Sequence, residues 1–300
     1  MVQGLRNETS EGRFDGVGGF RIFYRSWRPY GGARGIAVLV HGFNSHSGYY
    51  TWIASQLAAT GLAVYALDHR GRGRSEGERY YVETVDDYVT DLATFVQLAT
   101  SENPGLPVFM LGHSAGGVIS CVYALEHQDQ LAGLICESFA FKVPAPDFAL
   151  SILKGLSHIA PHAHVFKLKN ADFSRDPDVV QYMNADPLIH NEVQPTQTVA
   201  AMVRADERLE RELGSITIPL FIIHGTHDRA TRPSGSQQFY DTAGSSDKTL
   251  KLYEGYVHDL LNDLGREAVM ADIERWIDAR VTTAGADRAD LVEVVVTQRW

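Results

Sequence analysis

The chain has 300 residues, of which 44% are hydrophobic, and its formal net charge is −10. This length and apolar content suffice for one large domain with an inserted subdomain, whereas the negative charge argues against nucleic-acid binding. Residues 1–10 have no apolar core of signal-peptide length, and no stretch approaches the length of a membrane-spanning helix. We therefore expect a cytoplasmic protein that has no nucleic-acid partner.

Short apolar runs alternate with longer amphipathic ones, a pattern typical of parallel βα units. It predicts strands at Ile36–Val40, Ala63–Leu67, Val108–Leu111, Leu131–Cys136, Leu220–His224 and Thr249–Tyr253. It predicts helices at Tyr50–Ala59, Val85–Ala99, Val118–Glu126, Gly235–Thr242 and Arg266–Ala279. Because the strands are almost continuously apolar, we expect burial on both faces. The fold class is therefore α/β, a mostly parallel central sheet flanked by helices, with the alternating run Phe20–Trp27 as part of an antiparallel edge.

The alternation of strands and helices stops in residues 138–204, where Phe148–Leu156 has helical spacing. A structureless loop of that length is improbable in a compact domain. We therefore predict a helical cap at 138–204, inserted into a discontinuous core formed by residues 1–137 and 205–300. The tail, residues 281–300, fits either a disordered extension or an added edge strand.

The most informative motif is Gly112-His113-Ser114-Ala115-Gly116, which follows an apolar strand and precedes a helical pattern. A Gly-x-Ser-x-Gly sequence at such a turn is the nucleophile elbow of the α/β-hydrolases. Its glycines let the backbone turn sharply enough to expose the serine hydroxyl. The sequence therefore predicts Ser114 as a nucleophile.

A serine nucleophile needs a base and a third group that orients the base. In this fold the chain order is Ser, then acid, then His. Asp228 follows the strand Leu220–His224, and His258 follows the last strand and precedes the last helix. We predict a triad of Ser114, Asp228 and His258, with Glu137, which also ends a strand, as the alternative acid.

The tetrahedral intermediate needs two N–H donors for its oxyanion. One is Ala115, directly after the nucleophile, and the loop after an earlier strand offers Phe43 as the other. The glycine-rich stretch Asp68–Ser75 lacks the spacing of a phosphate-binding loop, so we interpret it as a turn that braces these loops. We expect no metal and no organic cofactor.

With these motifs the chain resembles the monoacylglycerol lipases and their bacterial relatives. The resemblance covers residues 20–280 and rests on His41–Tyr50, Asp68–Ser75, Gly112–Gly117, Tyr182–Leu188, Ile218–Phe221, Gly225–Asp228, Lys248–Gly255 and His258. It implies the same triad and oxyanion donors, hydrolysis of fatty-acyl esters of glycerol or similar alcohols, and no cofactor. It also implies a cap that encloses the acyl chain and makes transient contact with lipid surfaces.

The chain departs from the family pattern at Asn44, Ser45 and Tyr49, where glycine, glutamate and arginine are usual. These changes affect the expected alcohol rather than the expected chemistry. The alternatives are a general carboxylesterase or lysophospholipase that acts on another ester, such as an aromatic or xenobiotic one. From a different class, a catalytically silent binding protein would keep the same fold.

Overall fold

The computed structural model describes residues 8–297, with side chains described for residues 8–146 and 148–281. Two segments lie outside this description: residues 1–7, which belong to the segment used to predict a cytoplasmic location, and residues 298–300 of the tail. Within the described part, no helix is long and apolar enough to span a membrane.

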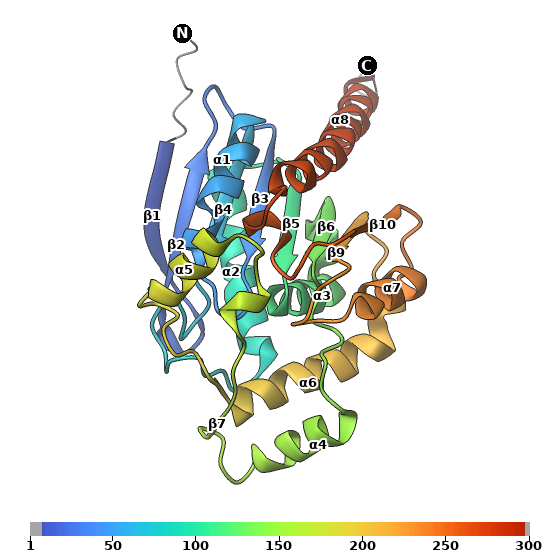
Figure 1. Ribbon diagram of the computed structural model, residues 1–300. Helices are drawn as coiled ribbons and strands as arrows, with labels where there is room; N and C mark the ends of the chain where they lie inside the picture. Colours follow the sequence, from blue (N-terminus) through green and yellow to red (C-terminus); the bar gives the residue numbers. More distant parts are fainter. Residues whose placement is uncertain (1–7, 298–300) are drawn as a thin grey trace.

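An eight-stranded sheet forms the centre of the molecule, in the order β1-β2-β4-β3-β5-β6-β9-β10 (Figure 1). Its strands are β1 (Glu8–Asp15), β2 (Arg21–Arg28), β3 (Gly35–Val40), β4 (Leu62–Leu67), β5 (Val108–His113), β6 (Gly133–Glu137), β9 (Leu220–Gly225) and β10 (Lys248–Tyr253). β2 pairs antiparallel with both β1 and β4, and all other neighbours in this sheet are parallel. The predicted α/β fold with a mostly parallel sheet is confirmed.

The edge of the sheet differs from the prediction. The run Phe20–Trp27 forms β2, which is antiparallel as expected but lies second from the edge. The edge strand is β1, which the sequence analysis missed. Most of its residues are exposed and polar, so it lacks the apolar signal that marks a buried strand.

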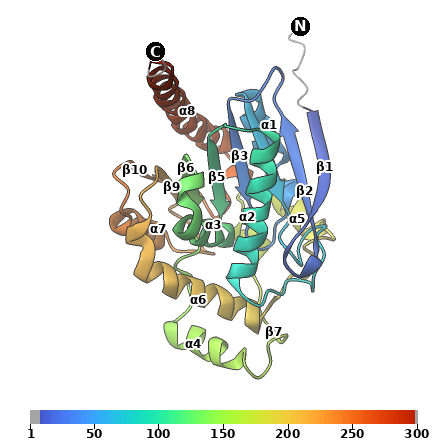
Figure 2. The same ribbon diagram turned by 180° about the vertical axis from the view of Figure 1, so that it is seen from behind.

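Helices cover both faces of the sheet (Figures 1 and 2). One face packs against α1 (Thr51–Ala59) and α8 (Arg266–Thr297), and the other against α2 (Val85–Glu102), α3 (Ala115–His127) and α7 (Pro233–Thr242). Successive side chains of a strand point to opposite faces, so neighbouring residues of β3 belong to different cores. The double cover explains why the strands are apolar throughout.

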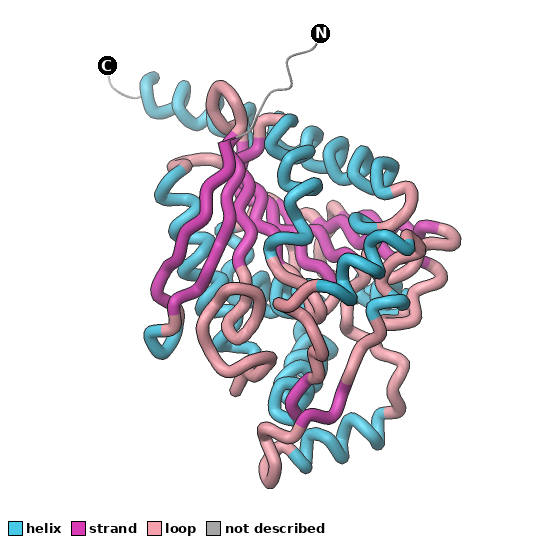
Figure 3. The backbone as a smooth tube through the Cα atoms, turned by 60° about the vertical axis from the view of Figure 1, so that its left-hand side comes forward, coloured by secondary structure: helices cyan, strands magenta, loops and turns pink. Residues whose placement is uncertain are grey.

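Residues 138–219 connect β6 to β9 and lie beyond the main sheet at one end of the molecule (Figure 3). They contain α4 (Asp147–Leu156), α5 (Pro177–Ala185), α6 (Thr196–Glu212) and a small sheet of β7 (His164–Phe166) and β8 (Gln194–Pro195). α4 packs against α6. We call residues 138–219 the insertion. The predicted domain boundary after residue 204 falls inside the continuous helix α6, and the division into domains stays a prediction.

The structure describes the tail only as far as residue 297, and there its backbone is helical. The backbone of α8 continues as a helix to Thr297 and points away from the sheet (Figure 1). Residues 281–297 contain three alanines but eight β-branched residues, Val or Thr. Because β-branched residues disfavour helices, local preference does not explain the helical backbone here.

Candidate active site

Ser114 lies at the turn between β5 and α3, and its backbone is strained. Its φ angle is +56°, in the left-handed region that residues with a side chain rarely adopt. The flanking glycines allow this turn because a side chain would have no room. A Cβ added at Gly116 would lie 2.2 Å from the Val40 carbonyl oxygen, and one at Gly112 would lie 2.5 Å from Ser120 Oγ.

His258 lies in the loop between β10 and a short 3₁₀ helix, and it reaches back to the turn at Ser114. Its Nε2 lies 2.9 Å from Ser114 Oγ. Both side chains are buried, with residue exposures of 0% for His258 and 5% for Ser114. An imidazole nitrogen at this distance is in position to accept the hydroxyl proton.

Asp228 follows β9 and lies on the opposite side of the imidazole. Its Oδ2 lies 2.8 Å from His258 Nδ1, and its Oδ1 accepts hydrogen bonds from the backbone N–H groups of Ala230 and Thr231. Burial alone raises the pKa of Asp228, but attraction to His258 and hydrogen bonds from His258 and His224 hold it well below its usual range. The carboxylate therefore stays ionised at neutral pH and fixes the orientation of the imidazole.

Two further side chains support Asp228 and were missed by the sequence analysis. Thr231 Oγ1 donates to Asp228 Oδ2 over 2.7 Å, and His224 Nε2 lies 3.0 Å from the same oxygen. His224 is in turn held through its Nδ1, which lies 2.7 Å from Ser236 Oγ. No motif signals these contacts, because they depend on how the loop folds back on the end of β9.

Glu137, the alternative acid, holds a different group. Its carboxylate accepts the backbone N–H of Leu261, three residues after His258, at 3.1 Å. Burial, and secondly the nearby Asp259, raise the pKa of Glu137 well above its usual value. A carboxyl that favours its neutral form is poorly suited to stabilise an imidazolium, whereas it fits the support of the loop that carries His258.

The described residues contain one cluster with metal-binding side chains, formed by His113, Glu137 and Asp259. The ligand atoms lie within 4.8 Å of one another, and all three residues are buried. Burial raises the pKa of Asp259 to about 6 and raises the pKa of Glu137 well above its usual value, while it lowers the pKa of His113. A carboxyl such as Glu137 that favours its neutral form is a poor ligand for a cation, which needs deprotonated ligands.

The predicted oxyanion donors lie on two segments that touch each other. Ala115 is the first residue of α3, so its N–H has no partner within the helix. A Cβ added at Gly42 would lie 2.9 Å from Ser114 Cβ and 3.3 Å from the Ala115 nitrogen. The backbone before Phe43 thus packs directly against the turn at Ser114, which only glycine permits.

The loop with Phe43 is also tied to the insertion. The backbone N–H of Asn44 donates to Glu192 Oε1 over 3.0 Å, and the same oxygen pairs with the buried Arg72. The Arg72 guanidinium lies 4.2 Å from the centroid of the Phe43 ring. Gln194 accepts from Arg72 over 2.6 Å and completes the network. We call Arg72, Glu192 and Gln194 the clasp. The clasp was not predicted from the sequence, because Arg72 lies about 120 residues before Glu192 and Gln194.

Two of the three positions that depart from the family pattern contact the insertion. Asn44 Nδ2 donates to Asn170 Oδ1 over 2.8 Å. Tyr49 donates through its hydroxyl to Asp186 Oδ2 over 3.1 Å, and His46 Nε2 lies 2.8 Å from the same oxygen. Asn44 and Tyr49 therefore both fasten the loop at residues 43–49 to the insertion.

An apolar cavity of about 150 Å³ opens beside Ser114, between the sheet and the insertion. Its lining includes Phe43, Leu150, Leu153, Leu168, Val199 and Met202. Such a cavity favours an apolar group bound next to the serine. We call it the acyl cavity.

Comparisons with known proteins agree with this geometry. A profile of the family described as "Serine aminopeptidase, S33" matches residues 31–265. The monoacylglycerol lipase of Mycolicibacterium smegmatis is 36% identical over 281 residues, which cover 92% of this chain and 99% of that protein. Human monoglyceride lipase is 34% identical and covers 88% of this chain and 89% of its own length. The crystal structure of Paleococcus ferrophilus monoacylglycerol lipase has a TM-score of 0.77 at 28% identity and covers 91% of this chain and 99% of that one.

The fold and the turn at Ser114 define an α/β-hydrolase, and the similarity to lipases over almost the whole chain makes it a carboxylic-ester hydrolase. More specifically, the chain belongs to the serine aminopeptidase S33 family and resembles its monoacylglycerol lipases most clearly at 36% identity. The family resemblance predicted from the motifs is confirmed.

Proposed function

We propose that the protein hydrolyses fatty-acyl esters through an acyl-enzyme formed on Ser114, with His258 as the base and Asp228 as the group that orients it. The observation that supports this most directly is the continuous contact from Ser114 Oγ to His258 Nε2, 2.9 Å, and from His258 Nδ1 to Asp228 Oδ2, 2.8 Å. The strained backbone at the serine adds to it, because such strain is typical of functional sites.

The reaction proceeds in two steps. His258 takes the proton of Ser114 Oγ, the oxygen attacks the ester carbonyl, and the N–H groups of Phe43 and Ala115 stabilise the oxyanion. His258 then gives the proton to the leaving alcohol, which departs and leaves an acyl-serine. In the second step His258 takes a proton from water, the hydroxide adds to the carbonyl, and the collapse of this intermediate returns the proton to Ser114 and releases the acid.

The acyl group lies in the acyl cavity, and we propose monoacylglycerol-like esters as the substrate class because the relatives include the monoacylglycerol lipase of Mycolicibacterium smegmatis and human monoglyceride lipase. A carboxylesterase acting on shorter esters is the second candidate. The volume of about 150 Å³ favours it, since cavities of that size bind ligands about as large as benzene.

We propose that residues 138–204 act as a cap over the site and touch lipid surfaces through α4. Phe148 and Ile152 lie one turn apart on α4 with exposed fractions of 69% and 64%, and Ile159 follows at 85%. Large side chains exposed this close together are typical of interaction sites. The net charge of −10 directs this contact to uncharged rather than anionic lipid.

Labelling with a fluorophosphonate probe and turnover of 4-nitrophenyl esters test the proposal. Ser114→Ala removes the nucleophile, so we expect loss of labelling and a decrease in kcat of roughly 10⁶-fold, with an unchanged thermal unfolding temperature. Ser120→Ala is the matched control, because Ser120 lies on α3, which begins directly after Ser114, is buried, and its hydroxyl has no hydrogen-bond partner among the described residues. Near wild-type turnover of Ser114→Ala contradicts the proposal. A wild-type protein that takes up no label identifies a silent binding protein.

A further inference from the structure

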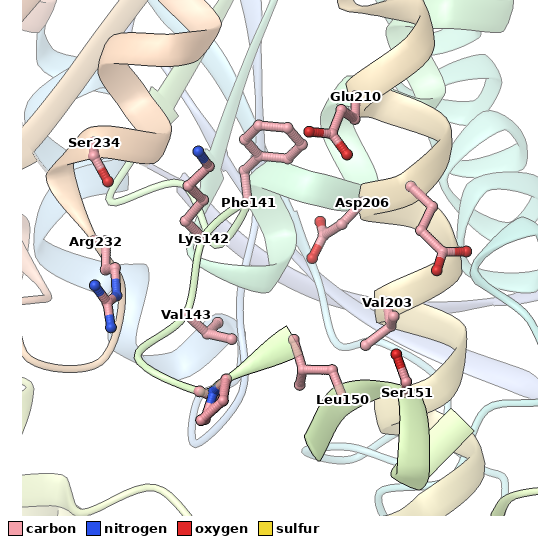
Figure 4. Close-up of a pocket in the computed structure, with 13 residues that line it drawn as sticks. Phe141, Lys142, Val143, Leu150, Ser151, Val203, Asp206, Glu210, Arg232 and Ser234 are labelled. Atoms are coloured by element: carbon pink, nitrogen blue, oxygen red, sulfur yellow. The ribbon is translucent and has the colours of Figure 1, made fainter. Parts of the chain in front are cut away.

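A second cavity lies behind the acyl cavity, and the two share part of their walls. The larger one has a volume of about 660 Å³ and lies between α4, α6 and the segment after β6 (Figure 4). The residues that line both are Val143, Ala145, Leu150, Val203 and Asp206. Ser114 lines only the acyl cavity. An acyl chain that starts at Ser114 and leads away from it therefore reaches the larger cavity at this shared wall.

Asp206 is the one charged side chain that lines the acyl cavity. Figure 4 shows its carboxylate directed from α6 into the space between Phe141 and Leu150. Its Oδ1 is shielded from solvent and has no hydrogen-bond partner among the described residues. Asp206 as a whole is only partly buried, but a shielded polar atom without a partner is unfavourable in the folded state, so this oxygen lowers stability in the ligand-free protein.

The surrounding charges do not neutralise Asp206. Its neighbours Glu207 and Glu210 lie on the same helix, and Glu207 pairs with Lys154. Burial first, and these two glutamates second, raise the pKa of Asp206 well above its usual value. Lys142 and Arg232 lie across the larger cavity (Figure 4), and the described ion pairs include none between either of them and Asp206.

The size of the acyl cavity sets the distance at which a substrate meets this carboxyl. A cavity of about 150 Å³ holds a ligand about the size of benzene, that is, about six carbon atoms. Beyond this length the walls become polar, because the larger cavity is lined by Lys142, Arg232, Glu207 and Glu210. A methyl group at the end of such an acyl chain would cover the Asp206 carboxyl without forming a hydrogen bond to it, whereas a hydroxyl group would form one.

We propose that Asp206 is a specificity-determining residue, and that the acyl cavity accepts medium-length acyl chains, of about six carbons, that carry a hydroxyl group at the far end. The assignment rests on the proposed ester hydrolysis at Ser114 and specifies its acyl group. A hydroxyl both donates and accepts, so it pairs with this carboxyl in its protonated and its ionised form. Plain fatty acyl esters remain substrates, but they leave Asp206 unpaired.

The experiment compares 4-nitrophenyl 6-hydroxyhexanoate with 4-nitrophenyl hexanoate. For the wild type we expect kcat/KM to be about tenfold higher for the hydroxy ester, the effect of one satisfied hydrogen bond to a buried group. Asp206→Leu should reverse this preference, and Asp206→Asn, which keeps hydrogen-bonding capacity, should retain part of it. Glu210→Gln is the matched control, because Glu210 lies one turn further along α6, is exposed and lines only the larger cavity; its preference should equal that of the wild type.

Binding to the Ser114→Ala background gives a readout that does not depend on turnover. Calorimetry on the Ser114→Ala variant should show that 4-nitrophenyl 6-hydroxyhexanoate binds about tenfold more tightly than 4-nitrophenyl hexanoate. Adding Asp206→Leu should abolish this difference in affinity. Equal binding of both esters overturns the assignment of Asp206, whatever the outcome for Ser114. A preference for the 6-ammoniohexanoate ester over the hydroxy ester also overturns it, because it would make Asp206 a partner for cations.

Stability provides the last test. Because Asp206 is unpartnered, Asp206→Leu and Asp206→Asn should unfold at the same temperature as the ligand-free wild type or a higher one. A lower unfolding temperature for both variants would assign Asp206 to the support of the fold and overturn the proposal.

Discussion

The proposed triad and the part of the insertion that lines the acyl cavity differ in how their polar side chains are paired. Around Ser114 each polar group of the proposed triad has partners, and Asp228 alone receives contacts from His258, His224 and Thr231. In the insertion, the carboxyl of Asp206 is left without a hydrogen bond to its Oδ1, and the apolar side chains on α4 are exposed. The triad is fully paired, although the loops around it also contain buried atoms without a partner among the described residues: Asn44 Oδ1, His69 Nδ1, His113 Nε2 and Ser138 Oγ.

The difference indicates which properties each region determines. A proton transfer requires fixed distances, so the groups that perform it are held by several contacts each. Selection among substrates requires groups whose partner arrives with the ligand. If this division is correct, substitutions in the strand-end loops change the rate of all esters, whereas substitutions in the insertion change the ranking of esters. Substitutions in the clasp, which joins the two regions, should change both the rate of all esters and the ranking of esters.

The largest effect should come from the acid of the triad. Asp228→Asn keeps the shape of the side chain but removes the charge that stabilises the imidazolium and fixes its tautomer, so we expect kcat to decrease by roughly 10⁴-fold for every ester. Glu137→Gln is the matched variant at the end of the neighbouring strand. Since the pKa of Glu137 is raised and its oxygen accepts the Leu261 N–H, a neutral amide replaces it with a change below tenfold. Steady-state kinetics on short and long esters measure both, and the reverse ranking would make Glu137 the acid.

The strand-end loops and the insertion also differ in how much of each could be predicted from the sequence. The turn at Ser114, Asp228 and His258 come directly after strands whose apolar pattern is local and strong, and parallel strands bring their carboxyl ends to one edge of the sheet. Local sequence patterns therefore sufficed to predict that these three residues lie close together, and the structure places their side chains in contact. Their catalytic role stays a prediction until the variants are measured.

The insertion shows where local patterns lose information. Asp206 lies on a helix with Glu207 and Glu210, so it looks like part of a solvated polar face, although it also lines the apolar acyl cavity. Glu192 and Arg72 are about 120 residues apart, and nothing in either segment indicates the other. Both cases depend on tertiary packing, which overrides the local signal. The boundary at residue 204 failed to match an element end for the same reason, since α6 runs through it.

A smaller effect should come from the clasp. Glu192→Gln keeps an acceptor for the Asn44 N–H but leaves the buried guanidinium of Arg72 without its charged partner, although Gln194 still accepts from it. Breaking a buried ion pair typically destabilises a protein by about 3–5 kcal/mol. We expect a clear decrease in unfolding temperature and a decrease in kcat of about tenfold, with less change in KM, because the loop with Phe43 loses a support.

Glu207→Gln is the matched control for the clasp, because it removes a carboxylate of the insertion whose partner, Lys154, is at the surface. Exposed pairs contribute about 0–1 kcal/mol, so its unfolding temperature and kcat should stay close to those of the wild type. Equal effects of the two substitutions would mean that the insertion and the strand-end loops are not coupled through Glu192.

The smallest effect, and the most selective, should come from the outer face of α4. The double variant Phe148→Ser, Ile152→Ser removes two side chains that are 69% and 64% exposed, so it should leave the unfolding temperature and the turnover of dissolved 4-nitrophenyl butyrate unchanged. If these side chains enter a lipid surface, the lost burial of apolar area should lower the turnover of monoacylglycerol in phosphatidylcholine vesicles by about tenfold. Tyr30→Ser is the control, because Tyr30 is 81% exposed outside the insertion and should affect neither assay. A parallel loss in both assays would show that α4 supports the acyl cavity instead of a lipid contact, and no loss in either would remove the lipid surface as a partner of this helix.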